Sequence, residues 1–66
     1  MKKIIISEKL KAYRNENKVT QQQIADLIGV TSQSISKWER EESYPDIAVL
    51  PLLAQTIGCK VDDFFA

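Results

Sequence analysis

Few side chains in this 66-residue chain could catalyse a reaction. A general base would have to be a carboxylate or a lysine, and the adjacent carboxylate pairs are Glu41-Glu42 and Asp62-Asp63. The first pair falls in a predicted turn and the second at a predicted helix start, where solvent or the helix dipole suits an acidic side chain. The serines have no histidine to activate them, because the chain contains none. We therefore do not expect an enzyme.

The residues that could hold a metal or a disulfide are equally scarce. Cys59 is the single cysteine, so an intrachain disulfide is excluded, and without histidine the usual zinc ligand sets cannot be assembled. We expect no metal and no cofactor. The longest apolar stretches, 4–6 and 49–54, fall far short of the roughly 20 residues that span a bilayer. No small-residue cleavage site follows the first stretch, so we expect a cytoplasmic protein without a membrane partner.

The charge is balanced overall but divided along the chain. Nine basic and nine acidic residues give a net charge of zero, which argues against a nucleic-acid partner, since phosphates favour positive surfaces. Residues 1–40, however, carry a net charge of +4, from eight basic and four acidic side chains, and residues 41–66 carry −4, from one and five. This division leaves two interpretations open, a basic face that meets an anion and a mixed surface charge without a function.

Apolar residues recur at spacings of three and four, which predicts an all-α fold. Residues 1–6 form either a loose arm or a short strand, because three isoleucines favour extended structure. Ser7 is placed to cap a first helix that runs to about Asn17. In the fourth helical segment, Pro51 produces a kink or marks the start of the main helix after a short first turn. A fifth short helix is expected over residues 61–65.

The segment from residue 20 to residue 40 predicts two helices joined by a tight turn. Thr20 and Gln23 have the spacing of a capping box, Gly29 suits a left-handed helix end, and Thr31 can cap the next helix. The inward positions are small or apolar: Ile24, Ala25, Ile28, Val30, Ile35 and Trp38. Such a pattern builds two helices at a steep angle and leaves the outer face of the second helix free to enter a DNA major groove.

These residues resemble the phage-repressor and Cro-like helix-turn-helix family, also called the XRE family. The matching positions cover nearly the whole chain: 13–14, 20–25, 28–30, 35–39, 44–46, 53–54 and 57–58. The resemblance implies one compact five-helix domain of the lambda-repressor type over residues 1–66, with the helix-turn-helix at 20–40 and C-terminal helices at 46–66. It also implies a sequence-specific transcriptional regulator, a repressor that binds a palindromic double-stranded DNA operator as a dimer.

The resemblance also assigns contacts to individual side chains. The positions that meet base edges in the family are Ser32, Gln33, Ser36 and Lys37. The positions assigned to phosphates are Gln21, Thr31, Ser34, Arg40, Ser43 and Tyr44. Side-chain chemistry agrees, because glutamine can bond adenine through two hydrogen bonds and lysine can donate to guanine. The alternative for these side chains is a solvated polar helix face.

Two further positions match an ion pair of the family, Arg14 on the first helix and Glu39 on the third. Both lie on inward faces, so we expect a structural role for them. Trp38 is expected in the core, because it follows the apolar Ile35 by three residues. The chain departs from the family at Glu41-Glu42, where many members have glycine or asparagine.

The C-terminal third offers apolar residues for a homodimer interface, namely Val49, Leu52 and Phe65. Phe65 suits completion of a small core equally well. A different class of function also remains open, in which the same fold serves as a protein-interaction module such as an antitoxin or an anti-regulator.

Overall fold

The computed structural model of the protein describes residues 3–66, so the start of the predicted arm at 1–6 lies outside the described residues. The described part contains four α-helices and two short 3-10 helices. The elements are α1 (Ile6–Asn17), α2 (Gln21–Ile28), α3 (Ser32–Glu39), η1 (Ile47–Val49), α4 (Leu50–Ile57) and η2 (Val61–Phe64). The all-α prediction is confirmed. In this range no helix is long and apolar enough to cross a membrane.

The expectation of a fifth α-helix is wrong. Residues 61–64 form the 3-10 helix η2, in which Phe65 N–H donates to the Asp62 carbonyl at 3.2 Å, an i to i−3 bond. The segment ends there because the next residues extend and pair with the N-terminal segment. Ile4 and Phe65 form an antiparallel bridge, and Ile5 N–H donates to the Phe64 carbonyl at 2.7 Å. A four-residue helix between a turn and an extended segment has no room for α-helical hydrogen bonding.

The same pairing explains why Ser7 does not cap α1. The helix begins at Ile6, and Ser7 is buried within its first turn. The N-cap position is Ile5, whose carbonyl accepts a hydrogen bond from Lys9 N–H at 3.1 Å and whose side chain offers no capping oxygen. The backbone contact with Phe64 thus fixes the start of the helix in place of a side-chain cap.

The predicted caps of α2 and α3 are present. Gln23 N–H donates to Thr20 Oγ1 at 3.0 Å while Thr20 N–H donates to Gln23 Oε1 at 2.8 Å, which is a complete capping box. Gly29 ends α2 with φ +75°, and Thr31 Oγ1 accepts from Ser34 N–H at 3.1 Å. α3 therefore follows α2 after a turn of three residues. Farther on, Pro51 lies in the first turn of α4, directly after η1, so the alternative with a short preceding turn is correct.

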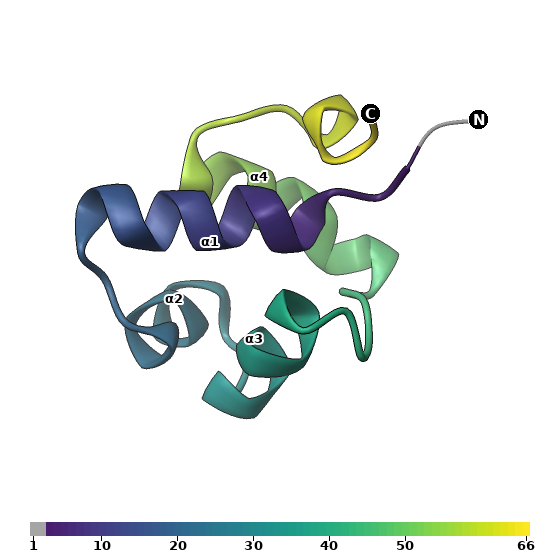
Figure 1. Ribbon diagram of the computed structural model, residues 1–66. Helices are drawn as coiled ribbons and strands as arrows, with labels where there is room; N and C mark the ends of the chain where they lie inside the picture. Colours follow the sequence, from purple (N-terminus) through teal and green to yellow (C-terminus); the bar gives the residue numbers. More distant parts are fainter. Residues whose placement is uncertain (1–2) are drawn as a thin grey trace.

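Each main element contributes one fully buried large side chain to a single core. These side chains are Leu10 of α1, Ile24 of α2, Ile35 of α3, Leu53 of α4 and Phe64 of η2. Figure 1 shows α1 across the middle of the molecule, with α2 and α3 below it and the C-terminal segment above. α3 contacts both α1 and α2. One face of α3 is consequently committed to the core and the other faces outward.

Among residues 3–66, two residues other than glycine adopt positive φ, Lys18 at +53° and Glu41 at +60°. A side chain in this left-handed conformation costs about 1–2 kcal/mol relative to glycine. We expect Glu41→Gly to raise the free energy of unfolding by about 0.5–1 kcal/mol, because the added entropy of the unfolded glycine offsets part of the strain removed. Chemical denaturation measures the change in the free energy of unfolding, and equal m-values of the variant and the unmodified protein show that only stability has changed. Glu41→Ala removes the charge but keeps the Cβ, so an equal gain from alanine would contradict the backbone explanation.

Candidate nucleic-acid interface

α3 has one buried face and one exposed face. Ile35 and Trp38 are buried in the core, which confirms the prediction for the tryptophan. Gln33 and Lys37 are exposed and four residues apart, so they lie on the same side of the helix. Ser32 and Ser36, the other predicted base-contact residues, are half-buried beside them. Gln33 and Lys37 therefore form the exposed face of α3, and Ser32 and Ser36 lie partly covered next to it.

The start of α3 is fixed by its own side chains. Thr31 Oγ1 lies 3.1 Å from Ser34 Oγ in addition to accepting the Ser34 N–H. Both hydroxyls are thus engaged at the helix N-terminus, where unpaired amides and the positive end of the helix dipole favour an anion. Thr31 is exposed and Ser34 is half-buried at this helix start, and both stay candidates for the predicted phosphate contacts.

An ion pair connects α1 with the end of α3. Arg14 Nε donates to Glu39 Oε2 at 2.5 Å and Arg14 Nη2 donates to Glu39 Oε1 at 2.8 Å, so both carboxylate oxygens are bonded. The Glu39 side chain is 6% exposed and that of Arg14 is 24% exposed. The hydrogen bond that Arg14 donates to Glu39 raises the pKa of Arg14 and outweighs the opposing effect of burial. Arg14 Nη1 also donates to the Val19 carbonyl at 3.4 Å, which ties the pair to the loop before α2.

Gln21 joins the same ion pair from α2. Its Nε2 donates to Glu39 Oε1 at 3.2 Å, and its side chain is half-buried. A primary amide carries two N–H donors, so one donor remains for an acceptor outside the domain. Sequence reasoning placed Gln21 at the interface but missed its bond to Glu39, because the two residues lie 18 positions apart and no local pattern links them.

The loop after α3 contains a second ion pair, Arg40 with Glu42. Arg40 Nε donates to Glu42 Oε2 at 2.5 Å, and Arg40 Nη1 donates to Ser36 Oγ. Sequence reasoning assigned Arg40 to a phosphate and did not foresee these bonds, although the Arg-Glu-Glu run offered a signal. Ser43 is half-buried and Tyr44 is exposed in the same loop.

The predicted dimer residues differ in exposure. Leu52 is 43% exposed, whereas Val49 and Phe65 are half-buried and pack against the core. Ile47, which fits the apolar spacing of the predicted fourth helical segment, is nevertheless 79% exposed at the start of η1. The reason is that residues 47–49 form a 3-10 turn, so the helical period begins only at Leu50. The exposed apolar surface of this region is therefore formed by Ile47 and Leu52.

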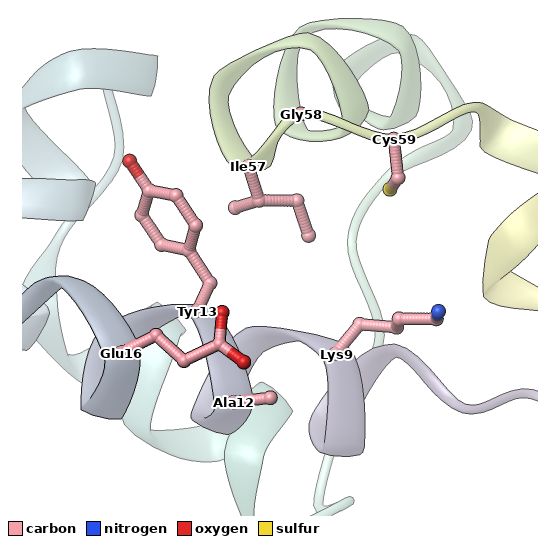
Figure 2. Close-up of a pocket in the computed structure, with 7 residues that line it drawn as sticks. All are labelled: Lys9, Ala12, Tyr13, Glu16, Ile57, Gly58 and Cys59. Atoms are coloured by element: carbon pink, nitrogen blue, oxygen red, sulfur yellow. The ribbon is translucent and has the colours of Figure 1, made fainter.

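A shallow pocket of about 250 Å³ lies between α1 and the end of α4, on elements other than α3 (Figure 2). Its lining residues are Lys9, Ala12, Tyr13, Glu16, Ile57, Gly58 and Cys59. Burial raises the pKa of the Cys59 thiol, Asp63 raises it further and Lys9 opposes them, so the thiol stays protonated near neutral pH. No cluster of three or more histidine, cysteine or acidic side chains that could bind a metal occurs among residues 3–66.

Comparison with known proteins gives consistent matches. The family model described as Helix-turn-helix matches residues 10–64. The chain is 31% identical over 58 residues to Repressor protein C2 of Salmonella phage P22, covering 88% of this chain but only 27% of that protein. It is 32% identical over 60 residues to MJ0272, an uncharacterized HTH-type transcriptional regulator of Methanocaldococcus jannaschii, covering 91% of each.

A solved structure has the same fold. The P22 c2 repressor in complex with synthetic operator 9T superposes with a TM-score of 0.84 at 30% identity, covering 91% of both chains. The chain thus spans about a quarter of the length of the full C2 repressor and nearly all of the part seen in that complex.

Removal of Arg14 tests the structural role of the ion pair. Arg14→Met leaves the Glu39 carboxylate buried without its cation, so we expect the free energy of unfolding to fall by about 3–5 kcal/mol. Lys11→Met is the control, because Lys11 is exposed on the same helix; a surface change of this kind shifts stability by less than about 0.5 kcal/mol. Urea denaturation compares them. Equal stability of the two variants would show that the pair is not structural.

Proposed function

The chain belongs to the helix-turn-helix family, and we propose that it binds double-stranded DNA through the uncovered face of α3 as a transcriptional regulator. The observation that carries the proposal is the division of α3 into a core face with Ile35 and Trp38 and an exposed face with Gln33 and Lys37. An α-helix fits the major groove, about 12 Å wide, only if such a face is free of the rest of the domain. Its proposed target also implies a cytoplasmic protein.

In this proposal the side chains of α3 read the bases. Gln33 pairs with adenine and Lys37 donates to guanine, while Ser32 and Ser36 bond whichever base edge they meet. Phosphate contacts fix the register of the domain on the duplex. They come from the starts of α2 and α3 and from the loop after α3: Gln21, Thr31, Ser34, Ser43 and Tyr44. Arg40, which the sequence analysis also assigned to a phosphate, is bonded to Glu42 instead.

Repression and operator binding are supported by the relatives. The P22 relative is named a repressor. Its solved structure is a complex with an operator, and the repressor in that complex matches 91% of this chain. We propose the same role here, a repressor on an operator with two-fold symmetry. A symmetric site implies two copies of the chain on half-sites about 34 Å apart.

The proposed contact between the two copies is the apolar surface of Ile47 and Leu52. Both residues are exposed, at 79% and 43%, and in sequence they flank the junction of η1 with α4. Apolar surface that is exposed to solvent favours association. Val49 lies half-buried between them in sequence and supports this surface from the core side, whereas Phe65 lies at the chain end paired with Ile4.

A protein-interaction module is the second candidate. The net charge of zero favours it, because the phosphate backbone rewards cationic surfaces. The bond of Arg40 to Glu42 favours it as well, since it neutralises a cation next to α3. Affinity for a random-sequence duplex distinguishes the two candidates. A DNA-binding protein binds the duplex, with an affinity that falls as the salt concentration rises, and a protein-interaction module does not.

Replacement of Gln33 tests base reading directly. Gln33→Ala removes both amide hydrogen bonds to a base, so discrimination between the preferred duplex and a scrambled one should fall by about 1–3 kcal/mol, roughly 5- to 150-fold. The preferred duplex is selected beforehand from a random oligonucleotide pool, and affinities are measured by fluorescence anisotropy. Gln55→Ala, on the exposed side of α4, is the matched control and should keep full discrimination. Undiminished discrimination by Gln33→Ala would refute the assignment.

The dimer surface is tested by Ile47→Glu. The contact between two chains would bury the new carboxylate, so this change should abolish cooperative binding of two chains to a duplex with two half-sites. Binding of one chain to one half-site should change little. Leu27→Glu is the control, because Leu27 is likewise an exposed apolar residue, at 63%, but belongs to α2 and not to η1 or α4. Sedimentation of the protein–duplex complex gives the stoichiometry. If Ile47→Glu binds the duplex as cooperatively as the unmodified protein does, this surface is excluded as the contact between the two chains.

A further inference from the structure

The Arg40 guanidinium connects the loop after α3 with the exposed face of α3 itself. Two of its nitrogens bond Glu42, Nε with Oε2 at 2.5 Å and Nη2 with Oε1 at 3.3 Å. The third, Nη1, donates to the hydroxyl of Ser36, one helical turn before Arg40. Ser36 is one of the four residues assigned to base contact. The three side chains therefore form a continuous chain of hydrogen bonds from Glu42 to a base-reading position.

These hydrogen bonds restrict the positions of both the Arg40 and the Ser36 side chains. A carboxylate that bonds two nitrogens of a guanidinium fixes its plane as well as its position, which a single bond would not do. The bond to Glu42 raises the pKa of Arg40, and the bond to Arg40 lowers the pKa of Glu42, so both groups remain charged over the physiological range. The cation is thus neutralised at the side of α3 where a phosphate would otherwise attract it.

The bond from Arg40 favours a donor role for the Ser36 hydroxyl. A serine hydroxyl has one O–H donor and two acceptor lone pairs, and a guanidinium can only donate. The bond from Arg40 therefore occupies a lone pair of Ser36 Oγ and leaves the hydroxyl proton free. That proton suits an acceptor on a base edge, such as guanine O6 or N7 or thymine O4, better than the amino group of cytosine.

We propose that Glu42 is a positioning residue for DNA recognition, which holds Arg40 against Ser36 and away from the phosphates. The inference rests on the proposed function and adds the residue that sets the balance between base reading and non-specific affinity. Phosphate contacts strengthen binding to every sequence alike. Glu42 keeps the Arg40 cation from the DNA phosphates, which lowers the affinity for random DNA. It also favours a donor role for the Ser36 hydroxyl, which increases selectivity for the base that Ser36 meets.

The test compares Glu42→Gln with Glu41→Gln. Both changes remove one negative charge from the same exposed loop, but within the described residues the Glu41 side chain forms no hydrogen bond with Arg40. Affinity for a random-sequence duplex is measured over a salt series. We expect Glu42→Gln to steepen the slope of log K against log salt by about 0.9 more than Glu41→Gln does, because Arg40 gains one phosphate contact. The double variant Arg40→Gln/Glu42→Gln should return the slope to that of Glu41→Gln.

Selection from a random pool supplies the second readout. Glu42→Gln should lose preference at the base pair that Ser36 reads, whereas Glu41→Gln keeps it. Equal slopes and equal preferences for the two single variants would overturn the positioning role while leaving DNA binding intact. A wild-type protein that binds no duplex at low salt would instead refute the proposed function, and with it this inference.

Discussion

The carboxylate of Glu39 is the contact on which the orientation of α3 depends. It is almost fully buried and accepts hydrogen bonds from Arg14 of α1 and Gln21 of α2. A buried carboxylate is stable only with such partners, so α3 cannot rotate or slide without leaving the charge unsatisfied. Apolar packing of Ile35 and Trp38 alone would tolerate more variation in the position of α3, because dispersion contacts have little directional preference.

The fixed orientation has a direct consequence for the opposite side of α3. Gln33 and Lys37 are exposed because the buried side is held by the core and by Glu39 together. A base-reading side chain must be held in place before binding, since ordering it at the interface reduces the affinity gained. The second ion pair extends the same principle to the loop, where Glu42 holds Arg40 and Arg40 holds Ser36. One ion pair thus orients the helix and the other orients a side chain on it.

The sequence predicted the features that local patterns determine. The capping box of Thr20, the left-handed Gly29 and the buried Trp38 each follow from spacing within one or two helical turns. The failures involve contacts between distant residues. Ser7 looked like a cap, but Phe64 pairs with Ile5 and moves the helix start, and the same pairing cuts the last segment to a 3-10 turn. The bond of Gln21 to Glu39 was missed for the same reason, because the two residues lie 18 positions apart. The bonds of Arg40 to Glu42 and Ser36 are local, and they were missed although the Arg-Glu-Glu run offered a signal.

Contact between the exposed side of α3 and a duplex can be observed by NMR titration of the labelled domain with double-stranded oligonucleotides. Selective changes in the side-chain signals of Gln33 and in the amide signals of Ser32 and Lys37 are predicted, with Lys9 and Glu16 at the pocket between α1 and α4 undisturbed. Changes confined to that pocket or to η1 and α4, with the α3 signals constant at saturation, would contradict the account.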